Sequence, residues 1–165
     1  MNLRARVGNA EIAVVHGDAT SLSGWGFDQS RLRDPAHRPQ IRAWLDAAAV
    51  QGFVCSHTCL PVLAQIESSG FVANNGAAGM PNFSNDLAGL ITRVATTPYS
   101  GPQRHWGMRH GSLFIDLLAI EYPQAAWQND FLAQWPPGSA AYESYWSRIS
   151  NGPAYAPHLL LNLGQ

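Results

Sequence analysis

The chain has 165 residues, a hydrophobic fraction of 46% and a formal net charge of -1 at pH 7. This length suits one domain with a substantial core, and the near-neutral charge gives no electrostatic reason to expect a nucleic acid or an anionic membrane as a partner. Every basic residue is an arginine. The absence of lysine excludes a Schiff-base lysine, a phosphate-binding P-loop lysine and a kinase-type lysine.

The compartment is indicated by missing targeting signals and by the cysteines. No apolar run approaches the roughly 20 residues of a membrane helix, and the start of the chain lacks the apolar core of a signal peptide. Cys55 and Cys59 lie across the end of an expected strand, where alternation places them poorly for a disulfide. We therefore expect reduced thiols and a cytoplasmic protein.

The chain is expected to open with a β-hairpin. Residues 3–7 and 11–15 are strand-like segments that flank Gly8 and Asn9, a pair suited to the positive φ angles of a tight turn. The second strand ends at His16.

A long irregular stretch follows at residues 17–38. It is rich in Gly, Ser, Asp and Arg, and it is too irregular for a helix and too long for an ordinary connection. Trp25 and Phe27 lie within it, and buried aromatic residues favour a functional loop over a disordered one.

The next elements predict a βαβ-like unit. Residues 37–50 read as a helix, with Pro39 in the first turn, and Gly52 is expected to end it. Residues 53–55 then return as a short buried strand, so the order is strand, loop, helix, strand. The apolar positions at helical spacing are Ile41, Trp44, Leu45, Ala48 and Ala49.

The remaining chain predicts more strands and then a helical tail. The small residues of segment 74–83 suit a backbone that passes close to another group. Aromatic stripes on the two tail helices are typical of core packing. The expected strands are 62–66 and 71–73, joined by a turn at 68–70, and 89–96 and 112–122, which form one antiparallel pair; the expected helices are 125–135 and 139–149.

The candidate metal ligands lie where two strands end. His57 and Cys59 follow the apolar run of residues 53–55, and His16 follows the earlier strand. Imidazole and thiolate are metal ligands, and loops at one sheet edge are where α/β proteins build sites. The alternatives are that a strand-end histidine only satisfies a backbone group and that cysteine serves as a small buried hydrophobe.

The other histidines occupy polar segments without partners at ligand spacing. We expect them to be structural or solvent-facing, although Arg104 and Arg109 would allow two of them to touch an anionic substrate. They are His37, His105, His110 and His158.

Three segments together resemble the calcineurin-like metallophosphoesterases. V-V-H-G-D at residues 14–18 is similar to the late "strand, His, Gly" motif of that family, and C-S-H-T-C-L-P at 55–61 is similar to its final G-H-T-H-x-P motif. F-V-A-N-N-G-A-A-G-M-P at 71–81 resembles the N-x-G-S-x-G-x-P signature that follows.

The resemblance implies an α/β fold with a β-sandwich core flanked by helices. Within one domain, residues 1–97 would hold the motifs, and 98–165 a strand pair and an aromatic-rich helical tail. It also implies a binuclear centre of Mn, Fe or Zn, in which His16 and His57 bind one metal and position 59 reaches the other. The activity implied is hydrolysis of phosphoric esters, in small molecules or phosphoproteins, by a metal-bound hydroxide.

The sequence departs from the family pattern at its last motif. Cys59 replaces the expected second histidine, and Ser56 replaces the expected glycine. A thiolate binds Zn or Fe, so the change would alter ligand hardness and metal preference. The same three residues, His16, His57 and Cys59, would also suit a mononuclear zinc site with an open fourth position.

The family's earlier motifs, D-x-H, G-D-x-x-D and G-N-H-D/E, do not occur in the chain. The chain therefore resembles the C-terminal half of such an enzyme, as a truncated frame, a split gene or a degenerate copy. Without the bridging carboxylate we assign no catalytic residue. The alternative function is a non-catalytic domain that uses Trp25, Phe27 and the helical tail to bind a partner, forms an oligomer, or pairs with a separate N-terminal half.

Overall fold

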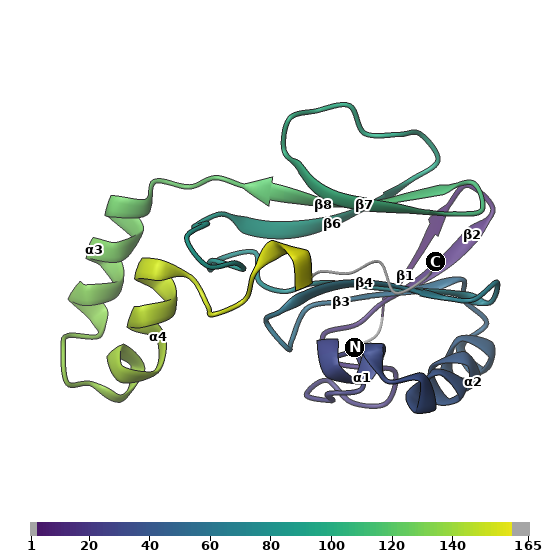
Figure 1. The fold of residues 1–165 in the computed structure, drawn as a ribbon, viewed down its shortest axis with the longest axis horizontal. Coiled ribbons are helices and arrows are strands. Elements are labelled where there is room, and N and C mark those ends of the chain that lie inside the picture. Colours follow the sequence, from purple (N-terminus) through teal and green to yellow (C-terminus); the bar gives the residue numbers. More distant parts are fainter. Residues whose placement is uncertain (1–2, 160–165) are drawn as a thin grey trace.

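The computed structural model describes residues 3–159, which form two β-sheets and four α-helices (Figure 1). The larger sheet has the strand order β1-β2-β3-β5-β4, and the smaller has the order β6-β8-β7. The strands are β1 Leu3–Val7, β2 Ala10–Val14, β3 Gly52–Cys55, β4 Pro61–Ile66, β5 Gly70–Asn75, β6 Gly89–Ala95, β7 Arg104–His110 and β8 Leu113–Ile120. The helices are α1 Gln29–Arg33, α2 Arg38–Ala48, α3 Gln124–Gln134 and α4 Ala140–Asn151, with short 3-10 helices at Pro35–His37 and Pro157–Leu159.

The larger sheet confirms the predicted hairpin and the βαβ-like unit. β1 and β2 are antiparallel, whereas β2, β3 and β5 run parallel, with Val14 opposite Val54 and Val54 opposite Ala73. The carboxyl ends of β2, β3 and β5 therefore meet at one sheet edge, where α/β proteins place their sites.

The predicted end of the first long helix was wrong. α2 ends at Ala48, and Ala49 adopts the left-handed conformation with a φ of 50°. Gly52 is instead the first residue of β3. A Cβ atom there would lie 2.3 Å from the Phe71 ring, so strand packing, and not helix termination, requires this glycine.

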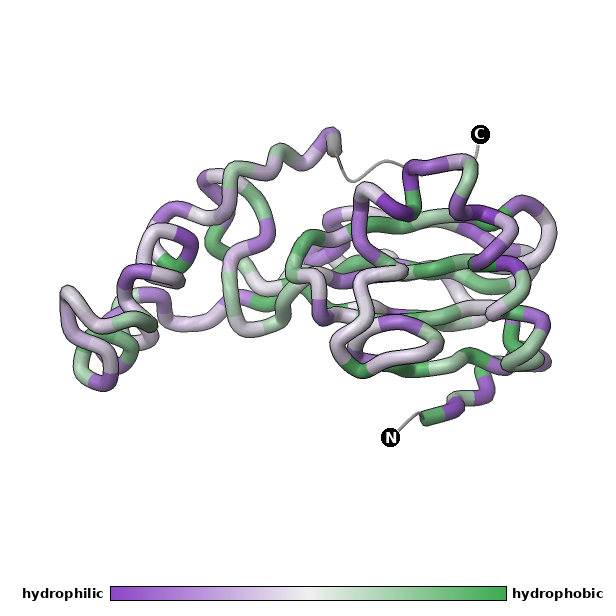
Figure 2. Tube along the Cα trace, turned by 90° about the horizontal axis from the view of Figure 1, so that it is seen from below, coloured by the Kyte–Doolittle hydropathy of each residue, from purple (hydrophilic) through white to green (hydrophobic). Residues whose placement is uncertain are grey.

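Two layers of buried apolar side chains hold the fold together. One lies between the two sheets, where Ile12, Phe71 and Leu63 meet Ile115 and Leu117. The other lies between the larger sheet and the α1–α2 side. Figure 2 shows the corresponding hydrophobic segments running along the strands. The second cluster comprises Ala13, Val15, Phe27, Leu32, Ile41, Leu45, Val50, Phe53, Cys55, Val62, Ala64, Ile66 and Val72.

The smaller sheet has one strand more than the sequence predicted. β6 and β8 form the expected antiparallel pair, but β7 also pairs with β8. His105 and His110 therefore lie on a strand and not in polar loops. The register shifts between Arg104 and Trp106. The strand sequence RHWGMRH is rich in Arg, His and Gly and has only Trp106 and Met108 as apolar positions, so its composition does not indicate a strand.

The stretch 17–38 is more ordered than the sequence indicated. It contains α1 and a 3-10 turn, whose first residues are capped by the side chains of Asp28 and Asp34. Its two aromatic residues differ in burial, because Phe27 is fully buried whereas Trp25 is 59% exposed.

The tail helices α3 and α4 form a hairpin that projects beyond the sheets (Figure 1). The helices were predicted correctly, but their aromatic stripes pack mainly on each other and not in the central core. Phe131 is buried, and its ring centroid is 6.0 Å from that of Trp146. Trp135 and Tyr145 remain exposed.

Neither a disulfide nor a membrane-spanning helix is found among residues 3–159. Cys55 and Cys59 are both free thiols, as expected. Among residues 3–159, no helix has the length and apolar character needed to cross a membrane.

Candidate metal-binding site

The backbone joins the loops that follow β2 and β3. The N–H groups of Ser56 and His57 both donate to the carbonyl oxygen of His16, at 3.2 and 3.0 Å. Because β2 and β3 are parallel and adjacent, these bonds continue the sheet beyond the strand ends. The two predicted histidines are thus delivered to the same place.

The imidazoles of His16 and His57 face each other. His57 Nδ1 lies 3.2 Å from His16 Nε2, and the ring centroids are 5.0 Å apart. The exposed ring of Trp25 lies edge-on to His57, with centroids 5.5 Å apart. The histidine pair is therefore open to solvent on one side and is bordered by the Trp25 ring on another.

Cys59 is turned toward the backbone of its own loop. Its thiol donates to the His57 carbonyl oxygen at 3.3 Å, and its φ of 58° lies in the left-handed region. Across residues 3–159, no group of three or more His, Cys, Asp or Glu side chains is placed to hold a metal ion. The structure brings two of the three predicted ligands together and leaves the third beside them.

Asn74, the first asparagine of the signature-like segment 71–81, supports this loop, a role that the sequence did not indicate. The fully buried Asn74 amide donates to Thr58 Oγ1 at 2.7 Å and to the Phe27 carbonyl at 3.1 Å, and its oxygen accepts from the Gly76 N–H at 2.9 Å. A polar residue at the end of an apolar strand was the available signal. Asn74 therefore links the end of β5 to the loop that contains Thr58 and to the loop that contains Phe27.

Asp18 organises the loop that carries Trp25. Its buried carboxylate accepts hydrogen bonds from the backbone of Thr20, Ser21 and Gly26 and from the Thr20 hydroxyl, at 2.8 to 3.0 Å. Burial raises the pKa of Asp18, but these hydrogen bonds outweigh burial and hold the pKa below its ordinary value. Asp18 is therefore a structural anion that shapes the border of the histidine pair.

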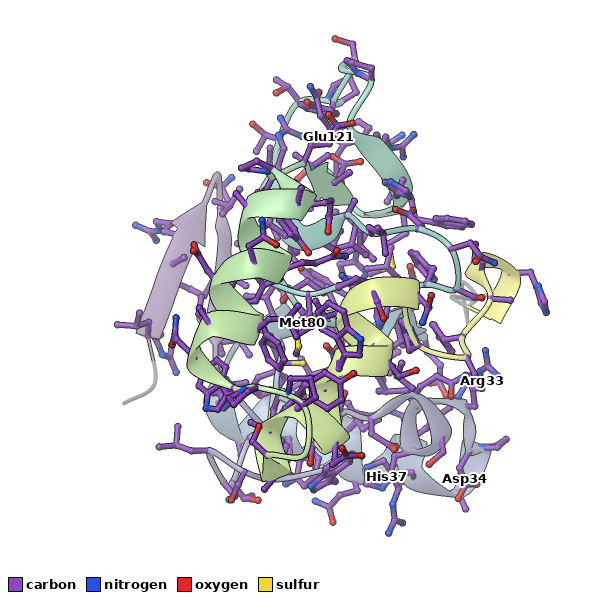
Figure 3. The ribbon with its side chains drawn as sticks, turned by 90° about the vertical axis from the view of Figure 1, so that its left-hand side faces the viewer. Arg33, Asp34, His37, Met80 and Glu121 are labelled. Carbon is purple, nitrogen blue, oxygen red and sulfur yellow. The ribbon has the colours of Figure 1, made fainter. Side chains whose placement is uncertain are left out.

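The helical tail holds the loops of the site in place. Arg148 on α4 donates through Nη2 to the carbonyl oxygens of Cys59 and Pro81, at 2.6 and 2.9 Å. The Tyr155 hydroxyl donates to the Pro61 carbonyl at 2.9 Å. Burial lowers the pKa of Arg148, while the nearby Cys59 and Tyr145 oppose that shift. In the view of Figure 3, Met80 projects between α3 and α4.

Replacing Arg148 with methionine is expected to lower the free energy of unfolding by about 1.5–3 kcal/mol, because methionine keeps the apolar stem and removes two charge-assisted hydrogen bonds. Urea unfolding followed by circular dichroism measures this change. The exposed Arg31→Met variant is the control and should change stability by less than about 0.5 kcal/mol. Equal effects of the two substitutions would contradict the role given to Arg148.

The remaining histidines lie outside the pair. His37 Nε2 is 3.0 Å from the Gly26 carbonyl, a structural contact, and His105 faces the Asp86 carboxylate at 3.7 Å. Burial lowers the pKa of His110. Arg104 is paired with the buried Asp116 carboxylate at 2.7 Å, and Arg93 shares the same carboxylate at 3.0 Å.

Two solved structures are similar to the chain over almost all of its length. One is a hypothetical protein from Pyrococcus horikoshii OT3, with 13% sequence identity and a TM-score of 0.54; 93% of this chain is covered, and 51% of that protein. The other is a metallophosphoesterase from Sphaerobacter thermophilus, with 18% identity and a TM-score of 0.51; 91% of this chain is covered, and 59% of that enzyme. The fold resembles part of a metallophosphoesterase.

This similarity confirms the resemblance that the motifs indicated, at the level of the fold. The chain spans only 51% and 59% of the lengths of these two proteins. No protein-family model matches the sequence, and no curated protein is detectably similar to it.

Proposed function

We propose that this chain is the histidine-bearing half of a metal-dependent phosphoester hydrolase and corresponds to the C-terminal part of the metallophosphoesterase fold. The imidazole pair carries the proposal. Two nitrogen ligands bound tetrahedrally to zinc, each at 2.0–2.1 Å, lie about 3.3 Å apart. His16 Nε2 and His57 Nδ1 lie at this separation, 3.2 Å, in a hydrogen bond, and a zinc ion would replace the proton that they share.

A third ligand within the chain would be Cys59. Its thiol lies in the same loop as His57 and would have to exchange its hydrogen bond to the His57 carbonyl for the metal. A thiolate beside two imidazoles favours Zn or Fe over Mn. According to the family resemblance, a metal bound here would polarise the phosphoryl group as a Lewis acid and would activate water.

The other ligands would come from a second polypeptide segment. Two or three ligands do not fill a binuclear centre, and among residues 3–159 no further His, Cys, Asp or Glu side chain is placed with the pair to hold a metal ion. The chain alone is therefore assigned metal binding and no catalytic residue. The substrate of the completed site would be a phosphoester, either a small molecule or a phosphoprotein.

Zinc binding tests the proposal. The purified chain, freed of metal with a chelator, is expected to bind about one zinc ion in a calorimetric titration, because the two imidazoles are already placed for it. His16→Ala and His57→Ala should each weaken zinc binding about 100-fold or more, beyond the effect of losing an outer-shell group. His158→Ala, which removes an exposed histidine, is the control and should leave binding unchanged.

The variants also separate the remaining alternatives. Cys59→Ser should weaken zinc binding if the thiol is the third ligand, and should leave it unchanged if only the histidine pair binds. An isolated chain that binds zinc but does not hydrolyse p-nitrophenyl phosphate would favour the half-site over a mononuclear zinc hydrolase. Absence of zinc binding in the parent chain would contradict the proposal and leave a non-catalytic binding domain.

A further inference from the structure

A cavity of about 420 Å³ lies between the first turns of α3 and the loop that contains Gly79. Its volume is within the range of sites that bind small organic molecules. Positions 123, 126, 127 and 130 recur at helical spacing, so one face of α3 borders the cavity. The complete lining is Gly79, Tyr122, Pro123, Ala126, Trp127 and Asp130.

The two aromatic residues present carbon surface to the cavity. The Tyr122 hydroxyl and Trp127 Nε1 are buried, so the accessible part of each side chain that borders the cavity is hydrocarbon or ring surface. Neither polar atom has a hydrogen-bond partner among residues 3–159. A ligand rich in hydroxyl groups, such as a sugar, would therefore find few hydrogen-bonding groups on these walls.

Asp130 is the charged residue of this lining. It is exposed, and within residues 3–159 it forms no ion pair. Residues 117–147 carry three acidic residues, Glu121, Asp130 and Glu143, and no arginine or histidine. The charge around the cavity therefore favours a positively charged ligand.

Aromatic surface beside a carboxylate suits an organic cation. The faces of tyrosine and tryptophan rings are electron-rich and attract ammonium groups, and quaternary ammonium ligands are recognised in this way. Elsewhere the chain supplies the cation itself, since Arg93 lies over Tyr99 and Arg109 lies over Phe114. No arginine among residues 3–159 lies over the two rings of the cavity, so their faces are available to a ligand.

We propose that this cavity binds a small organic ammonium ion. A quaternary or tertiary ammonium group would lie against Tyr122 and Trp127, with its charge balanced by Asp130, and the hydrocarbon part of the ligand would lie against Pro123 and Ala126. The cavity shares no lining residue with the histidine pair, so this inference does not depend on the metal site.

Gly79 offers a way to close the cavity. A Cβ atom at this position would meet no other atom within 4 Å, and the backbone of Gly79 does not have a positive φ. Gly79→Leu should therefore place its side chain in the cavity without backbone strain and exclude the ligand.

The test titrates the purified chain with choline and with benzyltrimethylammonium and follows the N-methyl proton resonance of each ligand by NMR. We expect a saturable 1:1 complex. The neutral compound 3,3-dimethylbutanol has the shape of choline without its charge and should bind at least about fivefold more weakly. Asp130→Asn should weaken choline binding about three- to tenfold, and this difference should shrink in about 0.5 M NaCl. Glu143→Gln removes the same charge from α4, outside the cavity, and should change binding less than about twofold.

Two further variants test the walls of the cavity. Trp127→Leu keeps an apolar side chain without the π-surface and should weaken choline binding about tenfold. Gly79→Leu should abolish it. Circular dichroism checks that each variant is folded, and if Trp127→Leu does not fold, Gly79→Leu and Asp130→Asn still decide the outcome.

Several results would overturn the inference. These are equal affinities for choline and 3,3-dimethylbutanol, equal effects of Asp130→Asn and Glu143→Gln, binding that Gly79→Leu leaves intact, or no saturable complex with either ammonium ion. Cosedimentation with phosphatidylcholine vesicles that Asp130→Asn abolishes would also overturn the assignment to a free ion, because the ammonium group would then be that of a lipid headgroup.

Discussion

A Phe27→Ala variant is expected to lose about 3–5 kcal/mol of the free energy of unfolding. The Phe27 side chain is fully buried, and its ring centroid is 5.0 Å from that of Phe53 and 5.6 Å from that of Trp44. Removing the ring leaves a cavity between the loop that carries Phe27, the larger sheet and α2. Urea unfolding monitored by circular dichroism measures the loss.

Two matched variants test whether loss of the buried ring causes this destabilisation. Phe27→Leu keeps most of the buried volume and should cost less than about 1.5 kcal/mol. Trp25→Ala removes an aromatic ring from the same loop, but that ring is exposed, so its cost should stay near 0.5 kcal/mol. If Phe27→Ala costs no more than Trp25→Ala, the loop is not anchored as the structure indicates.

These two aromatic residues show where sequence reasoning stops. Both are flanked by glycine or small polar residues in an irregular segment, and nothing local distinguishes them. The Phe27 ring packs on Phe53 and Trp44, and its carbonyl accepts a hydrogen bond from Asn74, 47 positions away. Burial in a loop depends on distant contacts, which periodicity does not report.

The parts that were predicted correctly depend on local signals or on general topology. Gly8 and Asn9 mark the hairpin turn, and alternation marks β6 and β8. The convergence of His16 and His57 followed from two parallel strands ending at one sheet edge. None of these inferences required knowledge of a specific distant contact.

The parts that were missed depend on long-range contacts or on local irregularity. Arg148 reaches Cys59 across 89 positions, and no pattern in the helical tail indicates this contact. β7 was missed because its sequence is rich in Arg, His and Gly, which gives little strand signal. The direction of the Cys59 thiol follows from a left-handed backbone angle, which is uncommon for cysteine and therefore not expected from the sequence.

Asp18→Ala is expected to lower the free energy of unfolding at pH 7 by about 2–4 kcal/mol, because it leaves several donors in a closed loop without their acceptor. The carboxylate accepts from Gly26 as well as from the turn at Thr20 and Ser21, so its loss frees both ends of the loop that carries Trp25. Urea unfolding measures the change. The exposed Asp46→Ala variant on α2 should change stability by less than about 0.5 kcal/mol.

The pH dependence of this effect has a defined sign. The folded-state pKa of Asp18 lies below its ordinary value, so the unfolded chain takes up a proton at higher pH than the folded chain does. Its stabilisation is fully present above the unfolded pKa of about 3.9 and is lost as the pH falls through the folded pKa. Asp18→Asn keeps one acceptor and has no titrating group. The stability gap between the parent and Asp18→Asn should therefore narrow from pH 5 to pH 3, and a gap that stays constant over this range would show that the carboxylate charge does not hold the loop.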